Sequence, residues 1–438
     1  MRSSGAWRAR AALVIGVAAV LTATACSSSS DSGGGGGGSG SSGGLKGSID
    51  FWMGDPIGDA QQPIMQKLAQ SYETAHPGTK VNLRFLGQDA HQTYLTSIAG
   101  GSVPCVALIG NTWTPEFASL GALDAYADDP KSMDGTYVPG MIDSTVFQGK
   151  SYGVPYDTGV RALIYRKDLL AGIGKTTPPA TWDELRADAI AIQQKNKGVN
   201  GFGIIGGAHW YYLPLIWNWG GNIATEQGDK WTSDADSQQA VAAFQFYSDL
   251  LTKDHLSPSG ATAWTAADVD KSMALGQTAM MVGGSWDLKT ITTQTPSMQG
   301  KLATAILPNG PGGNNDTFAG GSNLAVFHDC GNKPLAKDFV KFMLDKANLV
   351  PVTSNLGLLP ATIDALAQEK STGSFSSPLL KPYAEQADHT RSIPPVATWG
   401  KVEGANDIVN AMQSIMSGRK DASDAMKELA DQINQAIG

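Results

Sequence analysis

The sequence is poor in charged residues and carries no strong cluster of one sign. Lysine, arginine, aspartate and glutamate make up 16% of the 438 residues, and the formal net charge is −8. No basic run follows residue 10. Binding to nucleic acid or to an anionic membrane surface needs clustered lysine and arginine, so the sequence argues against both partners. With 42% hydrophobic residues, a chain of this length is typical of a folded protein with two packing units.

Cysteine and histidine are also scarce, with three and six residues. They form no Cys-x-x-Cys pair and no His/Cys spacing typical of zinc ligands, so we predict neither a metal nor another cofactor. Cys105 and Cys330 lie in the folded part of the chain. Outside the cytoplasm two such cysteines pair more often than they stay free, and two buried thiols are the alternative.

The N-terminus has the pattern of a secretion signal. Arginines at positions 2, 8 and 10 precede an apolar stretch of eleven residues, Ala11–Leu21. This stretch is too short to span a bilayer core of about 30 Å. Residues 1–25 are therefore predicted to be a signal peptide.

Two cleavage patterns overlap at the end of this signal. Residues 23–25 fit ordinary signal peptidase, whereas the same residues with Cys26 resemble a lipobox in which Ala23 replaces the usual leucine. Residues 27–44 are almost pure serine and glycine, which is typical of a flexible tether. A lone cysteine before a tether favours a lipid on Cys26, with residues 26–46 holding the protein at the outer face of the cytoplasmic membrane. Simple secretion is the alternative.

From residue 47 onward, short apolar strands alternate with amphipathic helices. The first part is expected to run as strand 48–53, helix 63–75, strand 80–86, helix 91–99 and strand 106–109. The same rhythm resumes after Pro155. This order predicts an α/β fold in which parallel strands are covered by helices. Two α/β lobes without a linker predict a chain that crosses between them, with the cleft as the ligand site.

Polar and aromatic residues gather in glycine-rich loops at the ends of these strands, where ligands bind in open α/β sheets. A sugar ring packs its apolar faces on aromatic rings, and its hydroxyls exchange hydrogen bonds with Asp, Asn and Arg. Any single cluster is more often ordinary packing, but their repetition predicts a site for a small neutral carbohydrate. The candidate ligand-binding residues are Trp52, Asp55, Gln88, Asp89, Asn111, Trp113, Tyr156, Asp157, Arg161, Trp217, Ser285, Trp286, Gly321, Ser322, Asn323, Arg391 and Trp399.

Enzymatic interpretations find less support. No carboxylate pair stands out as a glycosidase would require, and the formal G-x-S-x-G match at residues 40–44 lies inside the tether. The glycine-rich runs do not continue into a Walker Lys-Ser/Thr. We therefore predict a protein without catalytic activity. A lipid-anchored hydrolase with a carboxylate pair and a receptor for a non-sugar small molecule stay as alternatives.

Several stretches together carry a resemblance to a known family. They are GKSYGVPYDT (149–158), LIYRKDLL (163–170), PATWDEL (179–185), GQTAMMVGGSW (276–286), GGSNLAV (320–326) and LLPA (358–361). With these motifs in order, the chain resembles the family 1 extracellular solute-binding proteins, the carbohydrate-binding lipoprotein components of bacterial ABC importers. The resemblance covers roughly residues 48–430.

The resemblance implies a type II periplasmic-binding-protein-like fold, with two doubly wound lobes joined by crossing hinge segments and closing on the ligand. By analogy, residues 47–154 and 318–347 form the N-terminal lobe, and residues 155–317 and 348–438 form the C-terminal lobe. It also implies that the protein acts as a monomer and delivers its ligand to the permease subunits of an ABC transporter.

The resemblance assigns roles to some of the candidates. Tyr156 and Asp157 match an aromatic–acid pair that holds sugar hydroxyls, and Trp286 matches a sugar-stacking tryptophan. Residues 321–323 match a loop of hydrogen-bond donors, and residues 111–113 match a ligand loop in which many members carry an aspartate.

The resemblance also bears on the two cysteines. Cys105 opens one strand, and Cys330 follows the strand that the family places antiparallel beside it. A disulfide between them is therefore expected.

Overall fold

The computed structural model describes residues 45–54, 62–87, 89–228 and 230–438. The predicted signal peptide (residues 1–25), the lipid on Cys26 and the tether up to residue 44 lie outside these residues, as do the candidate ligand contacts Asp55 and Gln88. Among the residues that the structure describes, no helix is both long enough and apolar enough to cross a membrane.

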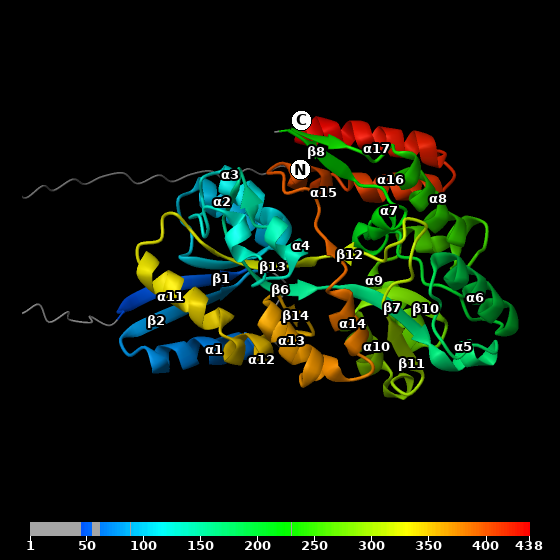
Figure 1. The fold of residues 1–438 in the computed structure, drawn as a ribbon, viewed down its shortest axis with the longest axis horizontal. Helices are drawn as coiled ribbons and strands as arrows, with labels where there is room; N and C mark the ends of the chain where they lie inside the picture. The colour runs from blue at the N-terminus through cyan, green and yellow to red at the C-terminus, as the bar shows by residue number, and fades with distance from the viewer. Residues whose placement is uncertain (1–44, 55–61, 88, 229) are drawn as a thin grey trace, which may run out of the picture. The chain divides into compact units, whose positions relative to one another are not determined.

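A six-stranded sheet organises the first half of the fold, with the strand order β14-β6-β13-β3-β1-β2 (Figure 1). Its strands are β1 (Gly47–Met53), β2 (Thr79–Phe85), β3 (Val106–Gly110), β6 (Val154–Gly159), β13 (Gly320–Val326) and β14 (Leu359–Pro360). β1 pairs in parallel with β2 and β3, which confirms the prediction from the strand–helix alternation. β13 runs antiparallel to β3 and β6, so a late segment of the chain completes this sheet.

Apolar helix faces cover this sheet. α1 (Gln62–Ala75) lies where a helix was predicted, and it buries Met65, Leu68 and Tyr72, whose spacing puts them on one helical face. α2 (Ala90–Ala99), α3 (Thr114–Ser119) and α11 (Lys333–Leu344) bury further apolar residues against the same strands. α12 (Lys346–Leu356) also joins this core, although the predicted lobe boundary placed the chain after residue 347 in the other lobe. The lobe boundaries stay a prediction, and the packing of α12 favours a boundary later in the chain.

A smaller antiparallel sheet, in the order β10-β7-β11, organises the second half. Its strands are β7 (Arg161–Arg166), β10 (Met280–Gly284) and β11 (Leu302–Ala305). The helices of this half are α5 (Lys167–Gly172), α6 (Trp182–Lys195), α7 (Pro214–Asn218), α8 (Gln238–Thr252), α9 (Ala266–Ala274) and α10 (Ser285–Gln294). α6 begins after Thr181, whose side chain caps the helix: the Glu184 backbone N–H donates to Thr181 Oγ1 at 3.2 Å.

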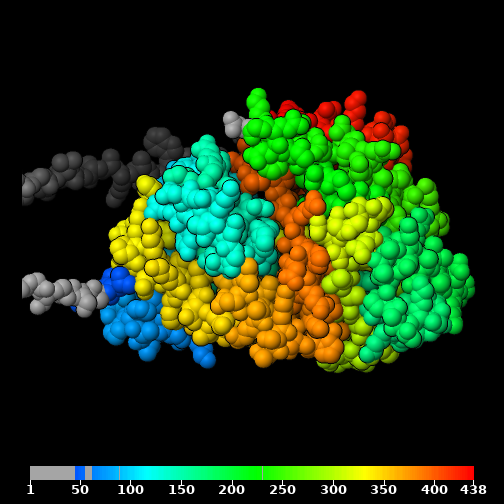
Figure 2. Space-filling model, in the orientation of Figure 1, coloured from blue at the N-terminus to red at the C-terminus, as the bar shows by residue number. Residues whose placement is uncertain are grey.

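The C-terminal helices belong to this second core. They are α15 (Trp399–Gly404), α16 (Asp407–Met416) and α17 (Ala422–Ile437), and they bury Trp399, Val402, Met412 and Leu429 there. The shorter elements are α4 (Pro139–Asp143), β4 (Val146–Phe147), β5 (Lys150–Ser151), β8 (Ala224–Gln227), β9 (Lys230–Ser233), α13 (Ile363–Ser371) and α14 (Lys381–Gln386). In Figures 1 and 2, the orange segment with α13 and α14 lies between the two halves.

The chain crosses directly from one half to the other at two places, and it crosses a third time after β14, since the following helices pack in the second core. Only Val160 separates β6 of the first sheet from β7 of the second. Later, β12 (Thr317–Phe318) pairs with β15 (Thr390–Arg391), and β13 of the first sheet begins two residues beyond β12. Because β6 and β13 pair with each other, the first two crossings lie side by side. The fold is thus the predicted two-lobed α/β arrangement with crossing segments.

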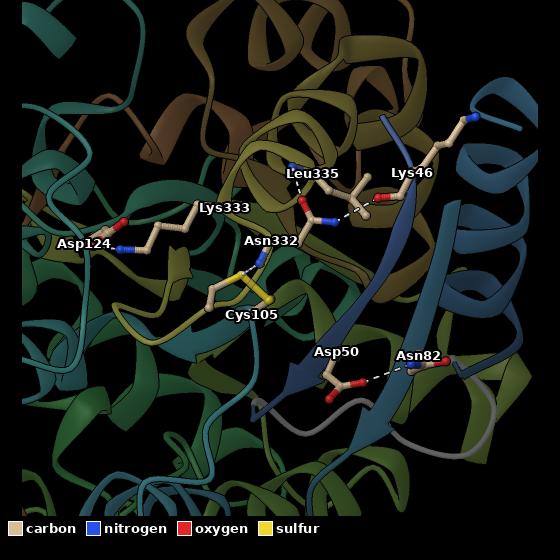
Figure 3. Close-up of a disulfide and its surroundings, with 9 residues drawn as sticks. Lys46, Asp50, Asn82, Cys105, Asp124, Asn332, Lys333 and Leu335 are labelled. Atoms are coloured by element: carbon tan, nitrogen blue, oxygen red, sulfur yellow. Dashed lines mark hydrogen bonds and ion pairs between the residues drawn. A yellow bond between two sulfur atoms is a disulfide. The ribbon is translucent and has the colours of Figure 1, made fainter. Parts of the chain in front are cut away.

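Cys105 and Cys330 form the expected disulfide, with an S–S distance of 2.10 Å (Figure 3). Cys105 immediately precedes β3, and Cys330 follows β13, its antiparallel neighbour. The Asn332 backbone N–H donates to Cys330 Sγ at 3.4 Å, and the Asn332 side chain caps α11. The disulfide therefore ties the late strand β13 to the sheet formed by the beginning of the chain.

Candidate functional site

A cavity of about 690 Å³ lies where the crossing strands meet the loops of both halves. This volume is in the range typical of small-molecule sites. The cavity is lined by Leu108, Gly110, Asn111, Thr112, Trp113, Asp157, Gly159, Arg161, Trp210, Trp286, Phe318, Gly320, Gly321, Leu356, Leu358 and Glu403. Six predicted site residues are among them: Asn111, Trp113, Asp157, Arg161, Trp286 and Gly321.

A second cavity, of about 480 Å³, lies between α11 and the segment 124–137. Its lining contains none of the predicted site residues, and it joins the apolar residues Val154, Leu324 and Val340 to a rim that carries Lys337 and Lys341. The chemistry that recognises a polar ligand is concentrated in the first cavity. We therefore take the first cavity as the candidate site.

Asp157 is held at the first crossing by the neighbouring strand. Its side chain is 1% exposed, and the Ser322 backbone N–H donates to Asp157 Oδ1 at 3.1 Å. Gly321, which pairs with this strand, has a φ of +149°, and a Cβ there would lie 2.1 Å from the Asp157 carbonyl oxygen. Only glycine fits this close approach of two backbones. The glycine therefore lets the two crossing strands pair at the floor of the cavity.

The short 3-10 helix η1 (Asn111–Trp113) directly follows β3 and forms another part of the wall. Asn111 is buried, and its Nδ2 donates to the Ala319 carbonyl at 2.8 Å, which ties this helix to the second crossing. Trp113 is half-buried and packs over Gly110, where a Cβ would lie 3.2 Å from its ring. The predicted loop thus presents one tryptophan to the cavity, while its asparagine also has a structural partner.

Trp286 and Arg161 form a stacked group at the start of α10. The Arg161 guanidinium lies 5.3 Å from the centre of the Trp286 ring and 4.4 Å from that of Tyr211. Such contacts between a cation and an aromatic ring are attractive. The indole fits here only because residues 159 and 284 are glycines. A Cβ at Gly159 or at Gly284 would lie within 3.0 Å of a Trp286 ring atom. The two glycines therefore let the Trp286 ring lie close to the backbone of the crossing strand.

Asp287 is hydrogen-bonded to residues that pack against this stacked group. The Gly284 backbone N–H and the Tyr211 hydroxyl donate to Asp287 Oδ2 at 2.8 and 3.1 Å. Burial raises the pKa of Asp287, and the hydrogen bond from Gly284 and the charge of Arg161 oppose the rise. Burial and the charge of Asp287 also raise the pKa of Asp270, to about 8. Two buried carboxyl groups thus lie behind the aromatic part of the cavity wall.

Trp210, Phe318 and Glu403 bring aromatic or charged side chains to the cavity but were not among the predicted contacts. Trp210 stacks on Phe318, with ring centres 4.3 Å apart and planes at 23°. Trp210 lies in an aromatic segment whose ends are Trp210 and Trp219, and the prediction chose Trp217 from this segment. Trp217 is instead 2% exposed in the second core. Glu403, the third, comes from α15, far from any strand end that pointed to a site.

Several predicted contacts are buried in the protein rather than turned to the cavity. Tyr156, Ser322, Asn323 and Trp399 have at most 1% of their surface exposed. Tyr156 precedes Asp157 in a strand, so its side chain points to the opposite face, into the core of the first half. Asn323 Nδ2 donates to Thr114 Oγ1 at 2.9 Å. As ligand contacts these residues stay untested, and the structure gives them packing roles.

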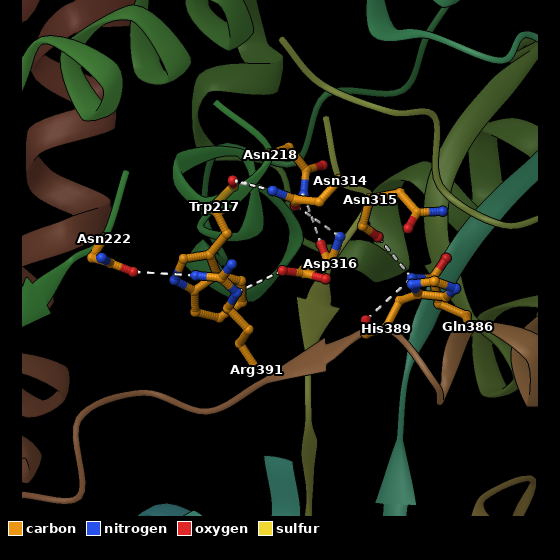
Figure 4. Close-up of polar contacts among 9 residues, drawn as sticks. All are labelled: Trp217, Asn218, Asn222, Asn314, Asn315, Asp316, Gln386, His389 and Arg391. Carbon is orange, nitrogen blue, oxygen red and sulfur yellow. Dashed lines mark hydrogen bonds and ion pairs between the residues drawn. The ribbon is translucent and has the colours of Figure 1, made fainter. Parts of the chain in front are cut away.

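The other predicted contacts lie elsewhere. Trp52 packs in the first half beneath Arg84, whose guanidinium lies 4.2 Å from its ring, and Asp89 is exposed at the start of α2. Ser285 donates to the Gly357 carbonyl. Arg391 is paired with Asp316 at 2.5 Å and with Asn222 at 3.2 Å (Figure 4). This ion pair anchors β15 beside the second crossing.

The cavity wall has no arrangement that would bind a metal. Among the described residues, no group of three or more His, Cys, Asp or Glu side chains is placed to hold a metal ion. Its chemistry consists of aromatic faces, two carboxyl groups, one guanidinium, the Asn111 amide, the Thr112 hydroxyl, backbone edges and a few apolar side chains. Such a wall binds a ligand that has both apolar faces and many hydrogen-bonding groups.

Comparison with known proteins places the fold in a family. Residues 57–349 match the family model described as bacterial extracellular solute-binding protein. The chain belongs to this family. The resemblance noted in the sequence is thereby confirmed.

Similar proteins extend this assignment to nearly the whole chain. The diacetylchitobiose binding protein DasA of Streptomyces coelicolor is 28% identical over 399 residues, which cover 89% of this chain and 90% of that protein. Among solved structures, the GacH receptor of Streptomyces glaucescens is 25% identical with a TM-score of 0.75, covering 90% of this chain and 99% of that chain. Maltose-bound MalE3 of T. maritima is 26% identical with a TM-score of 0.73, covering 89% and 99%.

Proposed function

We propose that this solute-binding protein captures a di- or oligosaccharide in the cavity between its two halves and delivers it to the permease of an ABC importer. The observation that carries the proposal is the stacked group of Trp286 and Arg161, which shares one cavity with Asp157. A pyranose ring packs on the indole, and its hydroxyls exchange hydrogen bonds with the carboxylate and the guanidinium. The ligands named for DasA, GacH and MalE3 support a saccharide.

The proposed contacts are narrower than those predicted from the sequence. They comprise the six predicted residues that line the cavity, together with Trp210 and Phe318. The stacked pair of Trp210 and Phe318 offers a second aromatic surface, so that a ligand of two or more rings has two places to pack. On this proposal the protein binds without chemistry and is held at the outer face of the cytoplasmic membrane by a lipid on Cys26.

A thermal-shift screen with diacetylchitobiose, maltose and maltotriose tests the proposal. A ligand that binds only the folded protein raises its melting temperature, and isothermal titration of any hit then measures its affinity. We expect tight binding of at least one saccharide and no product after prolonged incubation. A panel of saccharides without any effect, followed by a shift with a phosphate ester or a polyamine, would favour a receptor for a non-sugar solute.

The hydrolase alternative is separated by product formation. Two carboxyl groups, Asp157 and Glu403, line the cavity, as a carbohydrate hydrolase would need. Cleavage of the bound saccharide that is lost in Asp157→Asn would support that alternative. Binding without cleavage, in the wild type and in Asp157→Asn alike, supports a receptor.

A further inference from the structure

Glu403 makes a contact between the two halves of the protein. It lies in α15, whose residues Trp399 and Val402 are buried in the second core. Its carboxyl group faces η1 of the first half, where Thr112 Oγ1 donates to Glu403 Oε2 at 3.4 Å. The same residue lines the cavity. A movement that separates the two halves would therefore expose this carboxyl group to water.

The elements packed against Glu403 bring two further titratable groups close to it. His91 of α2 and Glu116 of α3 form a pair, with 2.7 Å between Nε2 and Oε2. α15 lies directly on this pair, because a Cβ at Gly400 would be 3.2 Å from Glu116 Oε2. Closing α15 onto the first half therefore brings the Glu403 carboxyl group toward another carboxyl group as well as toward an imidazole.

The ionised form of Glu403 is poorly satisfied in this position. Glu403 Oε1 is buried and accepts no hydrogen bond from any residue that the structure describes. The Trp399 indole N–H lies close enough to favour the ionised form of Glu403, but the contact falls short of good hydrogen-bond geometry. Burying a charge without such partners is costly. Burial raises the pKa of Glu403 to about 7, the Glu116 charge adds to the rise, and His91, Thr112 and Trp399 oppose it.

We propose that Glu403 is a positioning residue that lets the cleft close in its protonated form, so that capture of a neutral saccharide takes up a proton. This inference rests on the proposed function. It assigns to the site a dependence on pH and names the group responsible.

The direction in which affinity changes with pH follows from the open and closed states of the cleft. In an open cleft the Glu403 carboxyl group meets water, and its pKa returns toward the ordinary value of 4.5. The closed cleft then binds a proton that the open cleft has released, over the interval between these two pKa values. Affinity should therefore fall by up to about tenfold per unit as the pH rises through this interval, and it should level off above about pH 7.

The test measures binding of the saccharide selected in the thermal-shift screen between pH 5.5 and 8.0, by isothermal titration in two buffers with different ionisation enthalpies. Wild-type protein should bind more weakly at the higher pH and take up a proton near pH 6. Glu403→Gln, which keeps a similar shape without a titrating group, should bind with little dependence on pH and without proton uptake. Glu226→Gln, at an exposed position of β8, should behave as the wild type.

Two more variants test whether Glu403, and not a neighbouring group, takes up the proton. Glu116→Gln removes the neighbouring like charge, so its pH profile should level off at a lower pH than that of the wild type. His91→Gln should retain the pH dependence, because the histidine is not the group that takes up the proton. Circular dichroism checks that each variant is folded.

Several outcomes would overturn the inference. They are release of a proton on binding, an unchanged pH profile in Glu403→Gln, and loss of the profile in His91→Gln with its retention in Glu403→Gln. Saccharide binding that is independent of pH in the wild type would also contradict it, while leaving the proposed function in place. Failure of every saccharide to bind would instead contradict the proposed function.

Discussion

The cavity wall has two parts that are held in place very differently. The aromatic part is formed by Trp286, Trp210, Phe318 and Arg161. Two glycines let its indole pack closely against the backbone. Behind it, Asp287 is fixed by hydrogen bonds from Gly284 and Tyr211. In the acidic part, formed by Glu403 with Thr112 and Trp113, one hydrogen bond of 3.4 Å joins the two halves, and one carboxylate oxygen has no hydrogen bond among the described residues. The aromatic part is a prepared surface for stacking. The acidic part is held by fewer hydrogen bonds, so we expect the two halves to separate there at the lowest cost in free energy.

Removing the stacking surface should have the largest effect on saccharide binding. Trp286→Ala should weaken saccharide binding by about 1–3 kcal/mol, or about 5- to 150-fold in Kd, because an aromatic anchor is lost from a desolvated site. Isothermal titration measures the change. Trp231→Ala, which removes a half-buried tryptophan outside the cavity, is the matched control and should leave the Kd unchanged. Equal effects in the two variants would refute the assignment of Trp286.

Replacing the cation of the stacked group should have a somewhat smaller effect. Arg161→Met keeps part of the packing but removes the charge beside Trp286 and Tyr211, so binding should weaken by about 1–2 kcal/mol. Arg186→Met is the control, since Arg186 also lies near an aromatic ring, that of Phe246, but outside the cavity. Titration of both variants at one pH compares them. An undiminished affinity in Arg161→Met would separate the guanidinium from ligand binding.

The buried acids behind the aromatic part should make its half of the protein less stable at high pH. Because burial raises the pKa of Asp270 to about 8, the folded state holds a proton that the unfolded state has lost, and the free energy of unfolding falls as the pH rises from about 4 to 8. Asp270→Asn should therefore gain several kcal/mol relative to the wild type between pH 4 and pH 8, because the variant has no group that titrates at this position. Urea unfolding at the two pH values measures this.

The exposed Asp431 offers the matched control for that experiment. Asp431→Asn should change the free energy of unfolding equally at both pH values. A larger pH-dependent gain in Asp431→Asn than in Asp270→Asn would contradict the account of the buried pair.

The smallest expected effect belongs to the acidic part. Thr112→Val removes the hydrogen bond that favours the ionised form of Glu403, so the pKa of Glu403 should rise further. Affinity at pH 8 should fall by about 0.5 kcal/mol. At pH 5.5 it should not change, because the Glu403 carboxyl group of the closed cleft is protonated there. Thr225→Val, in β8, serves as the control. A loss of equal size at both pH values would show a packing effect instead.

Much of the fold was predictable because local residue patterns indicate where strands and helices lie. The parallel strands β1, β2 and β3 and the apolar face of α1 follow from residue spacing alone. The antiparallel insertion of β13 is a long-range pairing that no local pattern carries, and the family resemblance supplied it. The same resemblance placed the disulfide, which joins residues 225 positions apart.

The site was predictable where a residue lies beside a crossing strand, as Asp157, Arg161, Trp286 and Gly321 do. Tyr156 shows the limit of this reasoning, since the alternation of a strand turns one of two neighbouring polar residues into the core. Trp210 and Trp217 lie in one short aromatic segment, and only the tertiary packing decides which of them faces the cavity. Glu403 gave no local signal because its chemistry depends on His91, Thr112 and Glu116, which come from the other half of the protein.

A crystal structure of the protein with the saccharide selected by thermal shift tests the central claim most directly. The account predicts a sugar ring stacked on Trp286, with hydroxyls within about 3 Å of the Asp157 carboxylate and the Arg161 guanidinium. A saccharide bound outside this cavity, or within it but without contact to Trp286, would contradict the account.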